Sequence, residues 1–141
     1  MNSFELVNRV CAKLDEKVEK SGMASLTPEE RIVWFVWSAL GILGNGSFQY
    51  FFENDLDPEA TACCFQEIGL SNAAECFRLA DSLLPAEYSK AEWKRQLEML
   101  QQLEVSLDTL ARAVLSEEKQ AEARLEQHIL ARPKLKSLIT E

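Results

Sequence analysis

Few side chains in this sequence are of the types that carry out covalent chemistry. The 141 residues include one histidine, His128, and four cysteines, of which Cys63 and Cys64 are adjacent. His128 lies between Arg124 and Arg132 near a predicted helix end, where a solvated or dipole-stabilised imidazole is expected rather than a catalytic base. The sequence has no CxxC pair and no second histidine, so it lacks zinc-site spacing. We predict four reduced thiols whose role is packing.

Motifs that bind phosphate, activate a nucleophile or bind calcium are also missing. There is no HExxH, no nucleophile elbow and no glycine-rich phosphate loop, because Gly44–Gly46 lacks the lysine and the preceding strand that such a loop needs. The acids between Glu53 and Glu59 lack the glycine and the terminal glutamate of an EF-hand loop. We therefore predict a protein that is not an enzyme and has no cofactor and no metal site.

Carboxylates are the distinctive side chains of the middle of the chain. The net charge is −8, and residues 32–89 contribute −7 of it through eight acids and one base, Arg78. Such a charge repels nucleic acid and anionic membranes and attracts basic surfaces. Asp57 precedes Pro58 and is assigned to helix capping. The other seven are candidates for contact with a basic partner: Glu53, Asp55, Glu59, Glu67, Glu75, Asp81 and Glu87.

Two interpretations of these acids stay open on the sequence alone. They can form an ordinary solvated face, or they can be presented to a partner. Side chains three or four residues apart on a helix lie about 5–6 Å apart, and duplex DNA has a phosphate about every 1.7 Å of its axis. Rigid carboxylates on successive helices can therefore approximate the field of DNA. Arg78 lies three residues from both Glu75 and Asp81, and we expect it to neutralise part of this charge.

Helices must position these groups, because the hydrophobic pattern is helical throughout and shows no strand-like alternation. Apolar residues at steps of three and four predict an N-terminal helix at about 3–20. Thr27, Pro28 and Glu30 form a capping box that starts a second helix, which is apolar nearly all round and runs to Leu43. We predict an all-α fold, one domain over 1–141, with about six to eight helices around this central helix at about 28–43.

Further helix boundaries follow from glycine, proline and capping residues. Gly44–Gly46 is predicted to end the central helix, and a short helix at 47–53 places Phe48, Phe51 and Phe52 together in the core. Asp57, Ser71 and the capping box Ser89–Glu92 are predicted to start the next three helices. The chain begins without an apolar leader, and its longest apolar run, 32–43, is too short to span a membrane, so a cytoplasmic protein is expected.

A heptad-like seam follows the last of these starts. Apolar residues alternate at spacings of four and three from Trp93 to Val114. Residues 90–132 are predicted to form either one kinked helix or two helices that meet near Ser116. A second functional hypothesis is therefore a structural protein that forms a homodimer through this seam. A third is a small-ligand pocket around Asn45, Tyr50 and Asn54.

One block of residues resembles a known family. The pattern Asn45-Gly46-x-Phe48-x-Tyr50-Phe51-x-x-Asn54, with Glu30-Arg31 before it and Ile68-Gly69 after it, is similar to that of a bacterial family named for a DNA-mimic protein. The resemblance is best over about 29–85 and extends over about 27–139. Ser47 stands where the family usually has a second glycine. The positions that carry over are Asn45, Gly46, Phe48, Tyr50, Phe51 and Asn54, and their role can be structural.

The resemblance implies an all-helical and often dimeric fold. For the best-known member it also implies an acidic surface that occupies the DNA-binding face of a transcription factor. The leading hypothesis is therefore an acidic protein that binds a basic partner, as a DNA mimic, and that does not itself bind nucleic acid or membrane.

Overall fold

Eight α-helices and three short 3-10 helices make up the computed structural model, which describes residues 1–140. The α-helices are α1 (Ser3–Ser21), α2 (Pro28–Glu53), α3 (Pro58–Glu67), α4 (Ser71–Leu83), α5 (Trp93–Gln102), α6 (Glu104–Leu115), α7 (Glu118–Leu130) and α8 (Pro133–Lys136). The 3-10 helices are η1 (Met23–Ser25), η2 (Tyr88–Lys90) and η3 (Ser137–Ile139). The predicted all-α class is confirmed, and the described residues contain no strand.

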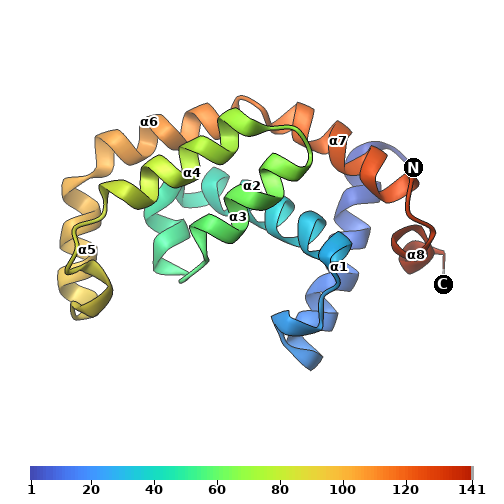
Figure 1. Cartoon of the computed structure of the whole chain (residues 1–141), viewed down its shortest axis with the longest axis horizontal. Helices are drawn as coiled ribbons and strands as arrows, with labels where there is room; N and C mark the ends of the chain where they lie inside the picture. Colours follow the sequence, from blue (N-terminus) through green and yellow to red (C-terminus); the bar gives the residue numbers. More distant parts are fainter. Residues whose placement is uncertain (141) are drawn as a thin grey trace.

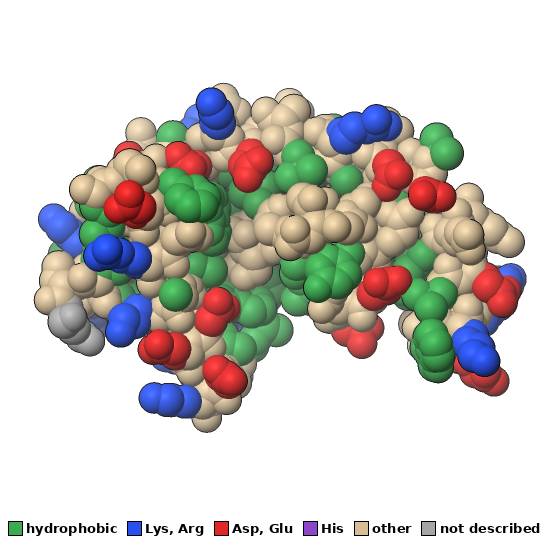
Figure 2. Space-filling view, turned by 180° about the vertical axis from the view of Figure 1, so that it is seen from behind, with side chains coloured by type: hydrophobic (Ala, Val, Ile, Leu, Met, Phe, Trp, Pro, Cys, Tyr) green, Lys and Arg blue, Asp and Glu red, His purple; other side chains and the backbone are tan. Residues whose placement is uncertain are grey.

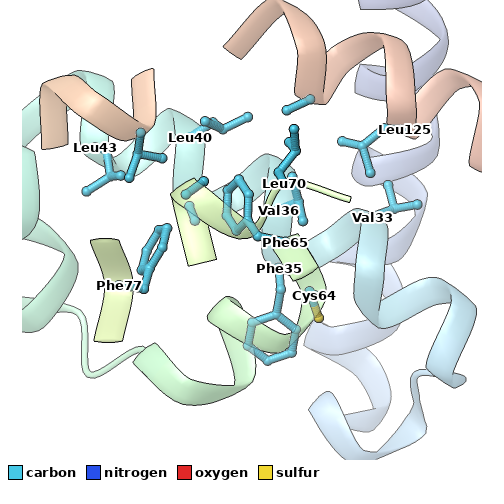
Figure 3. Packing of buried hydrophobic residues seen from close by; sticks show 14 of the residues in the cluster. Val33, Phe35, Val36, Leu40, Leu43, Cys64, Phe65, Leu70, Phe77 and Leu125 are labelled. Atoms are coloured by element: carbon cyan, nitrogen blue, oxygen red, sulfur yellow. The ribbon is translucent and has the colours of Figure 1, made fainter. Parts of the chain in front are cut away.

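The helix α2 is central, as predicted. It packs against α1, α3, α5, α6 and α7. In Figure 1 the helices form an arch, with α1 at one end, η2 and α5 at the other, and both chain termini at the α1 end. The core runs along the arch, and Figure 3 shows Val36, Leu40 and Leu43 of α2 close to Phe65 and Phe77.

The start of α2 is stabilised by the predicted capping box. The Thr27 side chain accepts a hydrogen bond from Glu30 N at 3.2 Å, and Glu30 Oε1 accepts one from Thr27 N at 2.9 Å. Lys17 Nζ of α1 lies 2.7 Å from the same carboxylate oxygen. Burial raises the pKa of Glu30, but the hydrogen bonds from Lys17 and Thr27 outweigh it and lower the pKa overall. This carboxylate therefore fastens α1 to α2.

A break at Gly46–Ser47 divides α2, slightly later than predicted. Gly44 is still helical, whereas Ser47 has φ 64° and ψ −166°, a conformation that is essentially confined to glycine. A Cβ at Gly46 would lie 2.5 Å from Cβ of Tyr50. The glycine of the family-like block is therefore required by the close approach of Tyr50, and the serine occupies a position that favours glycine.

The break turns the predicted aromatic group into the core. Phe48, Phe51 and Phe52 are buried, as predicted. Phe77 of α4 lies 5.0 Å from Phe48 and 5.2 Å from Phe51 between ring centroids, both edge-on. The ring centroid of Phe65 of α3 lies 5.2 Å from that of Phe77, and these two rings are stacked. Because edge-on aromatic pairs contribute beyond their buried area, Phe77 ties α4 and α3 to the end of α2.

Two of the three predicted helix caps are wrong. Asp57 does cap α3, accepting from Glu59 N and Ala60 N at 3.0 and 3.1 Å. Ser71 does not cap α4, because the chain turns at Gly69 with φ 82° and the capping position falls on Leu70. The box at Ser89–Glu92 does not form either, because Tyr88–Lys90 is a 3-10 helix and Glu92 makes no side-chain capping bond.

The segment from 90 to 132 forms three helices rather than one or two. It breaks at Leu103, between α5 and α6, and again at Glu117, close to the predicted junction at Ser116. The seam residues Leu100, Leu107 and Val114 are buried within the chain. The break at Leu103 lets α5 pack against η2 and the end of α2. The middle of the seam is therefore occupied inside the molecule, while Trp93 at its start is exposed.

His128 is buried, so the prediction of a solvated imidazole is wrong. His128 lies on α7, which packs against α1 and α2, and the residue is 7% exposed. His128 Nε2 lies 2.9 Å from the Glu29 carbonyl oxygen, and because a carbonyl only accepts, Nε2 carries the proton. Arg132 Nη1 donates to the His128 carbonyl at 3.0 Å. Burial lowers the pKa of His128, which favours the neutral ring.

Replacing Ser47 by glycine should stabilise the protein. The Ser47 hydroxyl is buried without a hydrogen-bond partner and its φ is positive. Removing the unpaired hydroxyl and the backbone strain should raise the free energy of unfolding by about 1–2 kcal/mol. This figure allows for the greater freedom of glycine in the unfolded chain. Urea unfolding measures it. Ser47→Ala is the control, because it removes the hydroxyl and keeps Cβ. A gain in Ser47→Ala that equals the gain in Ser47→Gly would contradict the strain argument.

Stability should fall as the pH drops below 6.5. The folded pKa of His128 is lower than its ordinary 6.5, so the unfolded chain binds the proton first and the stability from neutral His128 is lost as pH falls from 6.5 towards the lowered value. His128 is the only histidine, and carboxyl groups have ordinary pKa values well below 6.5. The variant His128→Gln keeps a donor for the Glu29 carbonyl. Its urea midpoint should change less with pH between 6.5 and the lowered pKa than that of the wild type. Parallel wild-type and variant profiles would refute this assignment.

Candidate functional site

Two adjoining hollows lie at the α5 end of the arch. One has a volume of about 360 Å³ and lies between the turn after α2, the end of α4 and η2. The other has about 410 Å³ and lies between the end of α2, η2 and α5. They share Phe52, Asp55 and Tyr88 as lining residues. We call the two hollows together the acidic groove, defined by Phe52, Glu53, Asp55, Asp81, Tyr88 and Trp93.

Aromatic rings form the apolar part of the acidic groove. Phe52 is buried, and its ring centroid lies 6.4 Å from that of half-buried Tyr88 in an edge-on arrangement. Trp93, at the start of α5, is 66% exposed. Gln96 Nε2 donates to the Tyr88 carbonyl at 2.8 Å and so fixes η2 against α5. Neither Tyr88 nor Trp93 was expected here from the sequence, which gave no signal for Tyr88 and placed Trp93 on the buried seam.

Three predicted acids surround these rings. Glu53 ends α2, Asp55 follows it with φ 52°, and Asp81 comes from α4. Negative charge is unfavourable at a helix C-terminus, so Glu53 and Asp55 gain nothing locally from their charge. Burial raises the pKa of Tyr88, and the charges of Asp55 and Glu53 raise it further. None of the three acids takes part in an ion pair within residues 1–140.

The remaining candidate acids lie elsewhere. Arg78 Nε lies 3.1 Å from Glu59 Oε2, so Arg78 pairs with Glu59 and not, as expected, with Glu75 or Asp81. The hydrogen bond from Arg78 lowers the pKa of Glu59. Glu67 lines a different hollow beside Arg124 and Arg132. Glu75 on α4 and Glu87 before η2 are exposed.

The acids do not form one continuous plate over the back of the molecule. Figure 2 shows acidic side chains interspersed with Lys and Arg on that face. Three of the candidate acids, Glu53, Asp55 and Asp81, line the two adjoining hollows of the acidic groove and come from α2, the turn after it and α4.

Four residues of the family-like block, Gly46, Phe48, Phe51 and Asn54, make structural contacts. Asn54 Nδ2 donates to the Tyr50 carbonyl at 2.7 Å and closes the end of α2. Phe48 and Phe51 are in the core, and Gly46 accommodates Tyr50. Asn45, Tyr50 and Asn54 line none of the five hollows found in residues 1–140. The geometry therefore gives no support to a ligand pocket at that block.

The reactive side chains lie in different surroundings. A hollow of about 450 Å³ is lined by Cys63, Cys64 and His128. Burial raises the pKa of Cys64 to about 11, and His128 is bonded to the Glu29 carbonyl. Cys11 is buried and Cys76 half-buried, but Cys63 is exposed, so the prediction that all four thiols pack is wrong for Cys63.

Within residues 1–140, no three side chains of the metal-binding types cluster. In that same part of the chain, every helix is too short or too polar to cross a membrane.

Comparison with known proteins gives one result. No curated protein and no solved structure is significantly similar to this chain. A family model described as DMP19-like protein matches residues 24–132, well over half of the sequence. The matched region contains α2 to α7 and therefore every residue of the acidic groove. The chain belongs to the family of DMP19-like proteins.

Proposed function

We propose that this protein acts by binding rather than by catalysis, and that it binds the positively charged surface with which a partner protein binds DNA. The observation that carries the proposal is the convergence of Glu53, Asp55 and Asp81, without ion-pair partners, around an open groove. Side chains of opposite charge on the partner would supply the missing counterions.

The wider charge distribution supports the same proposal. Residues 32–89 carry a net charge of −7, and their one base, Arg78, is paired with Glu59. Within this segment no other cation balances the remaining acids. A field of one sign accelerates encounter with a basic surface and weakens as salt screens it.

Family membership supports the finer form of the proposal, which is DNA mimicry. The block from Asn45 to Asn54 resembles that of a family named for a DNA-mimic protein, and the DMP19-like model covers it. The block itself is structural, so the mimicry proposed here rests on the acids and not on the block.

Partner capture should be exclusive with DNA. The full-length protein, immobilised through its N-terminus, is exposed to lysate of its source organism, and retained proteins are identified by mass spectrometry. We expect the retained proteins to be DNA-binding proteins. Added duplex DNA should release them, because both ligands use one basic surface. Retention should also be lost as salt rises from about 50 to about 200 mM.

The mode of binding is then tested with the purified partner. In fluorescence anisotropy, the protein should displace a labelled duplex from that partner. Formation of a ternary complex, or the absence of any retained DNA-binding protein at low salt, would contradict the proposed function.

A further inference from the structure

The acidic groove combines aromatic rings with carboxylates. Trp93 presents an indole that is 66% exposed, next to Tyr88 and Leu97. Glu53 and Asp55 line the same hollow as Trp93, and Asp55 and Asp81 line the adjoining hollow. Aromatic faces attract cations that lie over them, and carboxylates at the rim add direct charge pairing.

We infer that the acidic groove binds an arginine side chain carried by an extended basic segment of the partner, an inference that rests on the proposed function. A guanidinium is planar, so it can stack on Trp93 or Tyr88 while its edge donates paired hydrogen bonds to Asp55, which lines both hollows. Lysine offers a point charge that cannot satisfy both surfaces equally. The negative charge of the groove therefore favours a cationic occupant, and the aromatic rings favour arginine over lysine.

The size and the composition of the groove agree with this occupant. Each hollow, at about 360 and about 410 Å³, is in the range that holds a small ligand. An acidic or purely apolar partner would leave Asp55 and Asp81 desolvated without a counterion, which is costly. The bases that surround Glu67 in the hollow beside α7 have no counterpart here, since the groove lining contains no Lys or Arg.

Indole signals of the protein provide the readout. The three tryptophans are Trp34, Trp37 and Trp93. Trp34 Nε1 donates to Asp15 and Trp37 Nε1 donates to Asn8, both on α1 at the other end of the arch. In ¹H–¹⁵N spectra of the full-length protein, a ligand in the groove should therefore shift the Trp93 indole and leave the other two unchanged.

The probe is the capped peptide Gly-Gly-Arg-Gly-Arg-Gly-Gly, compared with its lysine and citrulline counterparts. Citrulline keeps the shape of arginine without the charge. We expect the arginine peptide to shift the Trp93 indole in a saturable manner, the lysine peptide to bind more weakly, and the citrulline peptide to have no effect.

Matched variants separate the groove from general attraction. Trp93→Leu, and the double change Asp55→Asn with Asp81→Asn, should weaken arginine-peptide binding about tenfold or more. Asparagine tolerates the positive φ of position 55, so the backbone is preserved. The control is Glu16→Gln with Glu19→Gln, two exposed acids of α1 that change the net charge equally. It should alter affinity less than about twofold, because distant exposed charges are screened.

Several results would overturn the inference. These are equal binding of the citrulline peptide, equal weakening by the α1 control, or broadening of the Trp93 signal with protein concentration alone, which would make a second copy the occupant. The two proposals fail separately. If the protein displaces DNA from its partner and the groove variants do so equally well, only the groove inference is lost. If the arginine peptide binds the groove but no partner competes with DNA, only the proposed function is lost.

Discussion

Ser47 holds a backbone conformation that is ordinarily reserved for glycine, and the course of the chain depends on it. An unbroken helix from Pro28 to Glu53 would be about 39 Å long and would carry its last turns past the core. The break instead directs Phe48, Phe51 and Phe52 towards Phe77. It also brings the end of α2 beside η2 and α5. The acidic groove exists because α2 is broken at this point.

The charge of a sequence is an upper limit on the charge that a fold presents. The Glu30 carboxylate takes part in the capping box and pairs with Lys17, Asp57 caps α3, and Glu59 pairs with Arg78. Those carboxylates stabilise helix ends and pairs of helices. Glu53, Asp55 and Asp81 take part in no ion pair within residues 1–140, and the charges of Glu53 and Asp55 at the C-terminal end of α2 are also opposed by the helix dipole. The acids that stabilise the fold are therefore recognised by their neighbours and not by their spacing in the sequence.

Local signals predicted what local interactions decide. The capping box at Thr27, the proline after Asp57 and the aromatic face of 48–52 act within one or two turns, so they could be found from the sequence. The breaks at Leu103 and the cap at Leu70 depend on how α5 and α4 pack, and His128 is buried because α7 lies on α2. The acids of the groove were predicted as candidates for partner contact from the charge of residues 32–89. Their convergence with Tyr88 and Trp93 required the arrangement of four separate segments, which no local pattern contains.

The unequal burial of the four thiols has a practical consequence. Cys11 and Cys64 are buried, with pKa values raised to about 12 and about 11, mainly by burial, whereas Cys63 is exposed on α3. An alkylating reagent needs an accessible thiolate, so at neutral pH modification is directed to Cys63. Its sulfur lies 3.6 Å from Glu59 Oε1, beside the ion pair with Arg78. A fluorophore or spin label can therefore be attached to the native sequence at a known place on α3, outside the acidic groove, without introducing a cysteine.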